Sequence, residues 1–216
     1  MKHYSAYIFD FDGVIKDSVK VKSEAFVQLY ASEGKEFQQK VEEYHLANGG
    51  ISRYVKFKVW NEWLGRSTSQ EVIDELANNF AQLVIEKVVA SPFVVGALEA
   101  LKSANESALT FIATGTPDDE INLILSELEL DEYFREVHGS SSKKSLIVKG
   151  ILERFNLTPA QVLFIGDAQT DYHAALENSL DFYLRQADYN SDWFDGKPGI
   201  TYQSNDLKYL NELISK

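Results

Sequence analysis

The sequence predicts an α/β protein, with a Rossmann-like parallel sheet as its core and an all-helical domain inserted into that core. Short apolar segments of strand length alternate along the chain with segments of helical periodicity, a pattern typical of a parallel sheet covered by helices. Residues 18–88 differ from the rest, because they show helical periodicity and few strand signals. We therefore expect one sheet and one separate helical part.

The expected strands are apolar, and each ends in a polar or glycine-containing turn. The three clearest are at 6–9, 108–113 and 162–165. They are followed by Asp10, by Thr114-Gly115 and by Gly166-Asp167. Because ligands of open parallel sheets bind outside the carboxyl ends of the strands, these three ends point to one site. Two weaker strands are expected near 182–184 and 200–202, the second at an edge of the sheet.

Helices are expected between these strands. The clearest begins after Thr116, which is interpreted as its cap, with Pro117 in the first helical position and acidic residues in the first turn. A second expected helix has the buried face Val95, Leu98 and Leu101, and a third has the face Val148, Ile151, Leu152 and Phe155. Strands and helices thus alternate through the second half of the chain.

The helical insertion is expected to be interrupted at glycines. Breaks lie near Gly34, around 48–50 and near Gly65, and Ser91-Pro92 indicates the return to the sheet. We therefore expect residues 1–17 and 89–216 to form the sheet core and residues 18–88 to form a separate helical domain.

Composition excludes several classes of function. The formal net charge is −12, which is a poor match to nucleic acid. The chain has no cysteine, which rules out thiolate chemistry and agrees with a reducing compartment. No targeting segment or apolar stretch long enough to cross a bilayer is visible. The expectation is a cytoplasmic protein with no nucleic-acid or membrane partner; the sequence leaves the oligomeric state open.

Two acidic motifs follow expected strands. Asp10 and Asp12 lie in an Asp-x-Asp-Gly motif after the first strand, and Asp167 and Asp171 follow another. Either motif alone has a simpler interpretation, since Asp and Gly form turns and Asp171 is well placed to cap a helix. If all four carboxylates converge, however, their repulsion requires a cation, and oxygen ligands suit Mg²⁺. We therefore expect a magnesium site formed by these four residues.

Two further features lie near the expected strand ends. Thr114-Gly115 follows the second strand, and the pair Lys143-Lys144 precedes a helix. Taken singly, they are compatible with an ordinary loop and with surface lysines.

The order of these motifs resembles that of the haloacid dehalogenase-like hydrolase superfamily over nearly the whole chain. The resemblance implies that Asp10 is the nucleophile and Asp12 the acid/base. It also implies that Thr114, with Gly115 beside it, binds the phosphoryl group. Asp167 would be the principal acidic metal ligand, and Asp171 would hold water or orient the metal shell.

The family lysine is assigned to Lys144 from its spacing to the following helix. Lys143 is the alternative, because this chain lacks the Lys-Pro pair that many members have at this point. The resemblance also implies a helical cap between the first two motifs. An Asp at position 12 disfavours carbon–halogen and carbon–phosphorus cleavage, since those branches of the superfamily lack it.

The function expected from these residues is hydrolysis of a small phosphorylated metabolite, dependent on Mg²⁺, through an aspartyl phosphate. A sugar-phosphate mutase is the first alternative, because Gly50-Ile51-Ser52-Arg53 resembles a cap loop of β-phosphoglucomutases. A non-catalytic binding module that retains the fold is the second. Arg53, which follows the flexible Gly49-Gly50, is expected to select the substrate from the cap.

Overall fold

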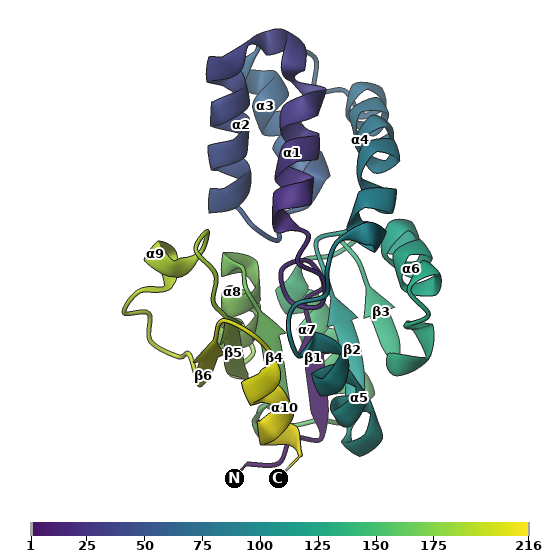
Figure 1. Cartoon of the computed structure of the whole chain (residues 1–216), viewed down its shortest axis with the longest axis vertical. Coiled ribbons are helices and arrows are strands. Elements are labelled where there is room, and N and C mark those ends of the chain that lie inside the picture. The colour runs from purple at the N-terminus through teal and green to yellow at the C-terminus, as the bar shows by residue number, and fades with distance from the viewer. Residues whose placement is uncertain (1, 216) are drawn as a thin grey trace.

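The computed structural model of the chain describes residues 2–215 and confirms the predicted α/β class. Its sheet has six parallel strands in the order β3-β2-β1-β4-β5-β6 (Figure 1). The strands are β1 (Ala6–Phe9), β2 (Leu109–Ala113), β3 (Glu136–His138), β4 (Val162–Gly166), β5 (Asp181–Arg185) and β6 (Tyr202–Ser204). This is the strand order of the Rossmann fold, whose ligands bind where the order reverses, beside β1.

The central strand β1 sets the position of the site. Phe9, its last residue, lies opposite Ile112 of β2 and Ile165 of β4. The loops that follow these three strands therefore begin at nearly the same level. As a result, residues separated by more than a hundred positions in the sequence meet at one edge of the sheet.

Alternation of side chains along β1 divides the sheet domain into two cores. Tyr7 and Phe9 face a cluster that includes helices α5, α6 and α10, whereas Ala6 and Ile8 face a cluster that includes α7 and α8. The helices of this domain are α5 (Ala97–Ser107), α6 (Asp118–Glu127), α7 (Lys144–Arg154), α8 (Gln169–Glu177), α9 (Ser191–Phe194) and α10 (Lys208–Ile214). Both faces of the sheet are thus covered, as its apolar strands require.

Four helices form a cap over the carboxyl ends of the strands (Figure 1). They are α1 (Val19–Leu29), α2 (Lys35–Ala47), α3 (Arg53–Trp63) and α4 (Gln70–Ala90). Short 3₁₀ turns lie at Ala31–Glu33 in the cap and at Asp131–Tyr133 and Pro159–Gln161 in the sheet domain. The breaks expected at Gly34, Gly50 and Gly65 occur, and each of these glycines has positive φ.

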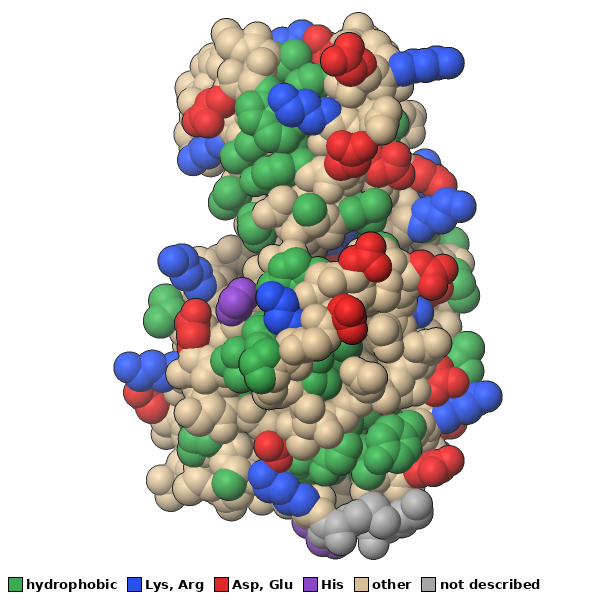
Figure 2. Space-filling view, turned by 90° about the vertical axis from the view of Figure 1, so that its left-hand side faces the viewer, with side chains coloured by type: hydrophobic (Ala, Val, Ile, Leu, Met, Phe, Trp, Pro, Cys, Tyr) green, Lys and Arg blue, Asp and Glu red, His purple; other side chains and the backbone are tan. Residues whose placement is uncertain are grey.

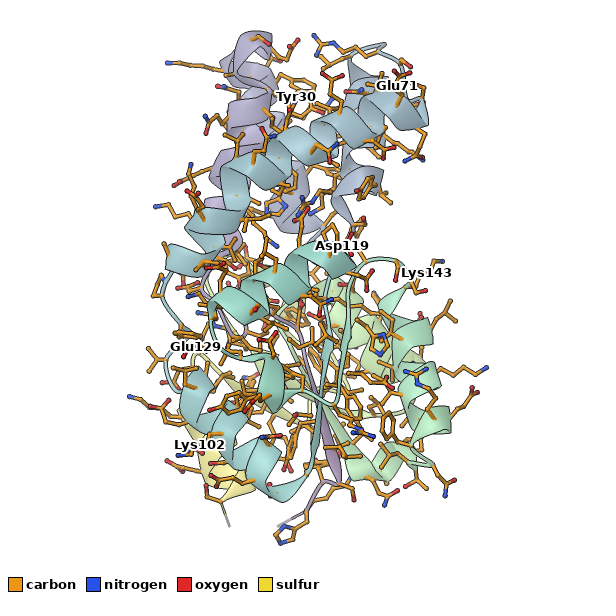
Figure 3. The ribbon with its side chains drawn as sticks, turned by 90° about the vertical axis from the view of Figure 1, so that its right-hand side faces the viewer. Tyr30, Glu71, Lys102, Asp119, Glu129 and Lys143 are labelled. Atoms are coloured by element: carbon orange, nitrogen blue, oxygen red, sulfur yellow. The ribbon has the colours of Figure 1, made fainter. Side chains whose placement is uncertain are left out.

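Aromatic side chains pack together inside the cap. Phe26 stacks on Phe80 at 4.0 Å between ring centroids and meets Trp60 edge-on at 5.1 Å. Tyr30 lies among the cap helices and packs on the same tryptophan (Figure 3). Trp60 is fully buried, so aromatic packing stabilises the cap, and the same hydrophobic cluster continues into the sheet domain.

Several local expectations differ from the structure. In α5 the buried face consists of Ala97, Ala100, Leu101 and Ala104. Val95 precedes the helix and is 56% exposed, and Leu98 is 40% exposed because it lies outside this buried face. Strand β3 was not expected, since its three residues are polar or half-buried and give no apolar signal. The expected edge strand exists as β6, but it begins only at Tyr202.

Between residues 2 and 215, the chain has no helix with the length and apolar character that a membrane span requires.

Trp60 provides a test of the cap core. We expect Trp60→Ala to lower the free energy of unfolding by roughly 3–5 kcal/mol, because it leaves a cavity among the packed aromatic rings. Trp63→Ala on the same helix is the control, since Trp63 is 38% exposed. Chemical denaturation of both variants measures the difference, and equal losses would contradict this account of the cap.

Candidate active site

Three buried carboxylates meet at the carboxyl edge of the sheet. Asp10 follows β1 directly, Asp167 follows β4, and Asp171 lies in the first turn of α8. One oxygen of each lies within 4.8 Å of the others, and all three side chains are buried. The parallel register of β1 and β4 therefore brings together three residues that sequence analysis expected to converge.

Lys144 joins two of these carboxylates. Its Nζ lies 2.7 Å from Asp10 Oδ2 and donates to Asp171 Oδ1 at 2.5 Å. Burial would lower the pKa of Lys144, but the two carboxylates outweigh it and raise that pKa. Lys143, the alternative, is exposed at the rim of the sheet domain (Figure 3). Of the two lysines, only Lys144 is in contact with the acidic cluster.

The cluster carries more negative charge than its lysine balances. Burial, together with the charges of Asp10 and Asp171, raises the pKa of Asp167 well above its usual range. Burial, with Asp10 again adding to it, raises the pKa of Asp171 to about 7. Three carboxylates around one ammonium therefore form a site that fits a hard divalent cation. The chemistry of the donor set thus agrees with the expected Mg²⁺.

Asp167 is oriented by residues that follow β5. Tyr189 donates a hydrogen bond of 2.5 Å to Asp167 Oδ2, and Asn190 donates one of 2.8 Å to its backbone oxygen.

The loop after β1 lies against the Asp167 carboxylate at Gly13. Gly13 has φ of +79°, and a Cβ there would lie 2.6 Å from Tyr189 Oη and even closer to Asp167. Only glycine allows this approach without displacing the carboxylate.

Asp12, expected among the metal ligands, has its carboxylate elsewhere. It accepts hydrogen bonds from Ser18 at 2.6 Å and Thr116 at 2.9 Å and forms an ion pair with Lys22 of the cap. Burial would raise its pKa, but Lys22 and these hydrogen bonds outweigh burial and lower it. The structure thus separates Asp12 from the Asp10, Asp167 and Asp171 cluster and links it to α1.

The loop after β2 completes the floor of the site. Thr114 is buried, and both it and Gly115 line a cavity of about 320 Å³ together with Asp10, Asp12 and Asp167. The expected helix cap at Thr116 is wrong: Pro117 occupies that position, and Thr116 instead donates to Asp12. The buried Thr116 hydroxyl reaches the half-buried carboxylate because the loops after β1 and β2 leave the sheet side by side.

The cap closes over this cavity. The α2–α3 loop rests on α8, where Gln169 donates to Ala47 O at 2.9 Å and Thr170 donates to Gly49 O at 3.3 Å. A Cβ at Gly115 would lie 2.7 Å from Gly50 O, so the two loops touch backbone to backbone. Figure 2 shows the two lobes with a constriction between them on one side of the molecule.

Arg53 lies at this junction. It lines the cavity, is 4% exposed, and forms a two-pronged ion pair with Glu120 of α6 at 2.8 and 2.6 Å. The sequence placed Arg53 near the cleft but gave no indication that its charge is balanced by the sheet domain.

Four contributors to the site were not expected: Ser18, Lys22, Tyr189 and Asn190. Ser18 and Lys22 contact Asp12, and Tyr189 and Asn190 contact Asp167, which lies more than twenty positions away in the sequence. Their types are common on surfaces, so no local signal distinguished them.

The fold and the site together describe an α/β enzyme with a carboxylate cluster at the switch point of its sheet. The family model for haloacid dehalogenase-like hydrolases matches residues 7–184, and the chain belongs to this family. A curated relative, the phosphorylated carbohydrates phosphatase of Thermotoga maritima, is 31% identical over 180 residues, which cover 79% of each chain. On this evidence the chain is a phosphatase enzyme.

Solved structures have the same fold. A predicted phosphoglycolate phosphatase from Haemophilus somnus superimposes with a TM-score of 0.75 at 17% identity, covering 100% of this chain and 98% of the other. A HAD-hydrolase of Bacillus subtilis, described as bound to magnesium and as showing interdomain movement, gives 0.73 at 16% identity over the whole of both chains. At these identities the similarity concerns the fold.

The two adjacent lysines provide a matched test. In magnesium-free buffer, we expect Lys144→Met to lower the free energy of unfolding by roughly 3–5 kcal/mol, because it leaves buried carboxylates uncompensated. Lys143→Met removes an exposed charge and serves as the control. Denaturation curves of the two variants measure the difference. A loss at position 143 as large as at position 144 would contradict the role of Lys144 in the cluster.

Proposed function

We propose that the protein hydrolyses a small phosphorylated metabolite with Mg²⁺ as cofactor and an aspartyl phosphate as intermediate. One observation carries the proposal: at the floor of the cavity beneath the cap, Asp10 is paired with Lys144 at 2.7 Å and lies beside the other two carboxylates. A carboxylate held in this way has an oriented oxygen and a counter-charge that lowers the repulsion of an incoming phosphate.

In this proposal Asp10 is the nucleophile. Its Oδ1 accepts a hydrogen bond of 2.7 Å from Phe11 N, and its Oδ2 faces Lys144, so the carboxylate is held in one orientation. One carboxylate oxygen would attack phosphorus as the bond to the leaving oxygen breaks, giving the aspartyl phosphate. Water would then release inorganic phosphate and restore Asp10.

Asp12 is the proposed acid and base. It would give a proton to the departing oxygen and later take one from the attacking water. Lys22 holds Asp12 as a carboxylate in the present arrangement. A substrate that draws this ammonium away would raise the pKa of Asp12 and allow it to carry the proton.

The phosphoryl group is proposed to lie between Lys144 and the Thr114-Gly115 loop. Asp10, Asp167 and Asp171 would hold the magnesium ion, which supplies charge neutralisation for the phosphate oxygens. The Asp12 side chain is a weaker candidate ligand than these three, because its oxygens are already taken by Ser18, Thr116 and Lys22.

The cap is proposed to select the substrate. The proposed cap comprises residues 18–88, and the proposed core comprises residues 1–17 and 89–216; α4 itself continues to Ala90. Arg53 remains a proposed specificity residue, but a substrate anion would have to share its guanidinium with Glu120.

By analogy with the Thermotoga phosphatase and the predicted phosphoglycolate phosphatase, small phosphorylated carbohydrates and acids are the first substrates to test. We propose a cytoplasmic location.

Asp10→Asn tests the nucleophile. We expect turnover of phosphomonoesters to fall by on the order of 10⁴-fold or more, since an amide of the same shape forms no acyl phosphate. Asp119→Asn, at an exposed position in α6, is the control and should keep full activity. Phosphate release is the measurement, and undiminished release by a folded Asp10→Asn protein would overturn the mechanism. Isomerisation that depends on a bisphosphate, without net phosphate release, would instead indicate a mutase.

Removal of metal tests the cofactor. Activity should disappear in excess chelator and return with added Mg²⁺, because the buried carboxylates repel a phosphate until a cation is bound. Asp167→Asn should raise the Mg²⁺ concentration for half-maximal activity by at least roughly tenfold. The exposed Asp195→Asn should leave that concentration unchanged. Full activity in chelator, with metal shown to be absent by elemental analysis, would refute the site.

A further inference from the structure

One lysine of the cap is buried without a carboxylate partner. Lys56 of α3 is 2% exposed, and its Nζ lies 2.8 Å from His45 Nδ1 of α2. Within residues 2–215, it forms no ion pair. A buried ammonium without a counter-charge is costly, and an apolar residue would fill the same place without that cost. This side chain therefore calls for an explanation other than packing.

The neighbouring cations are already paired. Lys22 is bound to Asp12, and Arg53 is bound to Glu120 through both prongs of its guanidinium. Burial, together with the charges of Lys22 and Arg53, lowers the pKa of Lys56 to about 7, although Asp12 opposes this shift. Of the three basic side chains at this end of the cap, Lys56 is the one that an incoming anion meets without displacing a carboxylate.

Lys56 and the proposed nucleophile share one cavity. Lys56, His45 and Lys22 line it from the cap, and Asp10 lines it from the sheet domain. Phe26 and Phe80 add apolar walls, and the ring of Phe26 lies 5.7 Å from Lys56 Nζ. The cavity thus has a phosphoryl site at one end, aromatic walls, and a basic end in the cap.

We propose that Lys56, positioned by His45, binds a second anionic group of the substrate, a carboxylate or a phosphate, while the reacting phosphate lies at Asp10. His45 Nδ1 accepts a hydrogen bond from the lysine, which fixes the ammonium and leaves its other protons for the ligand. The substrate class is then a small phosphomonoester with an anion at its far end. This inference rests on the proposed function, because it uses the same cavity.

Three phosphonates of similar length provide the test, since their carbon–phosphorus bonds are not expected to be hydrolysed. Propylphosphonate has one anionic group, phosphonopropionate adds a carboxylate, and propylenediphosphonate adds a second phosphonate. We expect wild-type protein in Mg²⁺ buffer to bind at least one of the doubly anionic probes roughly 10- to 100-fold more tightly than propylphosphonate, as measured by calorimetry. The probe that gains affinity identifies which anion the site prefers.

Substitutions of Lys56 test whether this lysine causes the tighter binding of the doubly anionic probes. Lys56→Met should reduce this affinity ratio to near one, and Lys56→Arg should restore part of it. Lys58→Met, an exposed lysine on the same helix, should keep the wild-type ratio. If Lys56→Met does not fold, Lys56→Gln gives the same measurement with a neutral polar side chain.

Two results would overturn the inference. The first is equal affinity of wild-type protein for all three probes, and the second is an unchanged ratio in the folded Lys56 variants. If propylphosphonate binds and phenyl phosphate is hydrolysed in these cases, the proposed function stands and only the second anion site fails. If propylphosphonate does not bind and phenyl phosphate is not hydrolysed, the proposed function is contradicted, and this inference with it.

Discussion

The structure depends on the burial of three carboxylates around a single ammonium. Asp10, Asp167 and Asp171 would repel one another strongly in a site of low dielectric constant, and Lys144 balances only part of their charge. The remaining negative charge makes the site suited to a cation. The parallel sheet makes the arrangement possible, because it delivers the loops after β1 and β4 at the same level.

A second charge pattern runs across the cavity from the sheet domain to the cap. The floor is acidic and the roof is basic, and two pairs cross between them: Asp12 with Lys22, and Glu120 with Arg53. Both pairs are largely withdrawn from water, so breaking either by removing one partner leaves a poorly solvated charge. The same contacts that join the cap to the sheet domain thus occupy Asp12 and Arg53, two groups that the proposed function assigns to catalysis and substrate selection.

Sequence patterns correctly predicted the elements that have strong local signals. The buried strand before Asp10 and the glycine breaks in the cap are examples, since apolar runs and glycines at positive φ act on their own neighbours. Elements without such signals were missed or misplaced. Strand β3 was missed because it has no apolar run. Thr116 was predicted to cap a helix because nothing in its local sequence indicates the hydrogen bond that it donates to Asp12.

The sequence by itself determined the fold class, the cap position, and the acidic motifs with their order, because these follow from periodicity and residue type. Tertiary structure decided which groups meet. It brought Lys144 rather than Lys143 to the carboxylates, turned Asp12 toward Lys22, paired Arg53 with Glu120, and left Lys56 buried with His45. These outcomes depend on side-chain direction and burial across contacts between distant segments. The strength of a charge interaction is set by that environment, which no local pattern records.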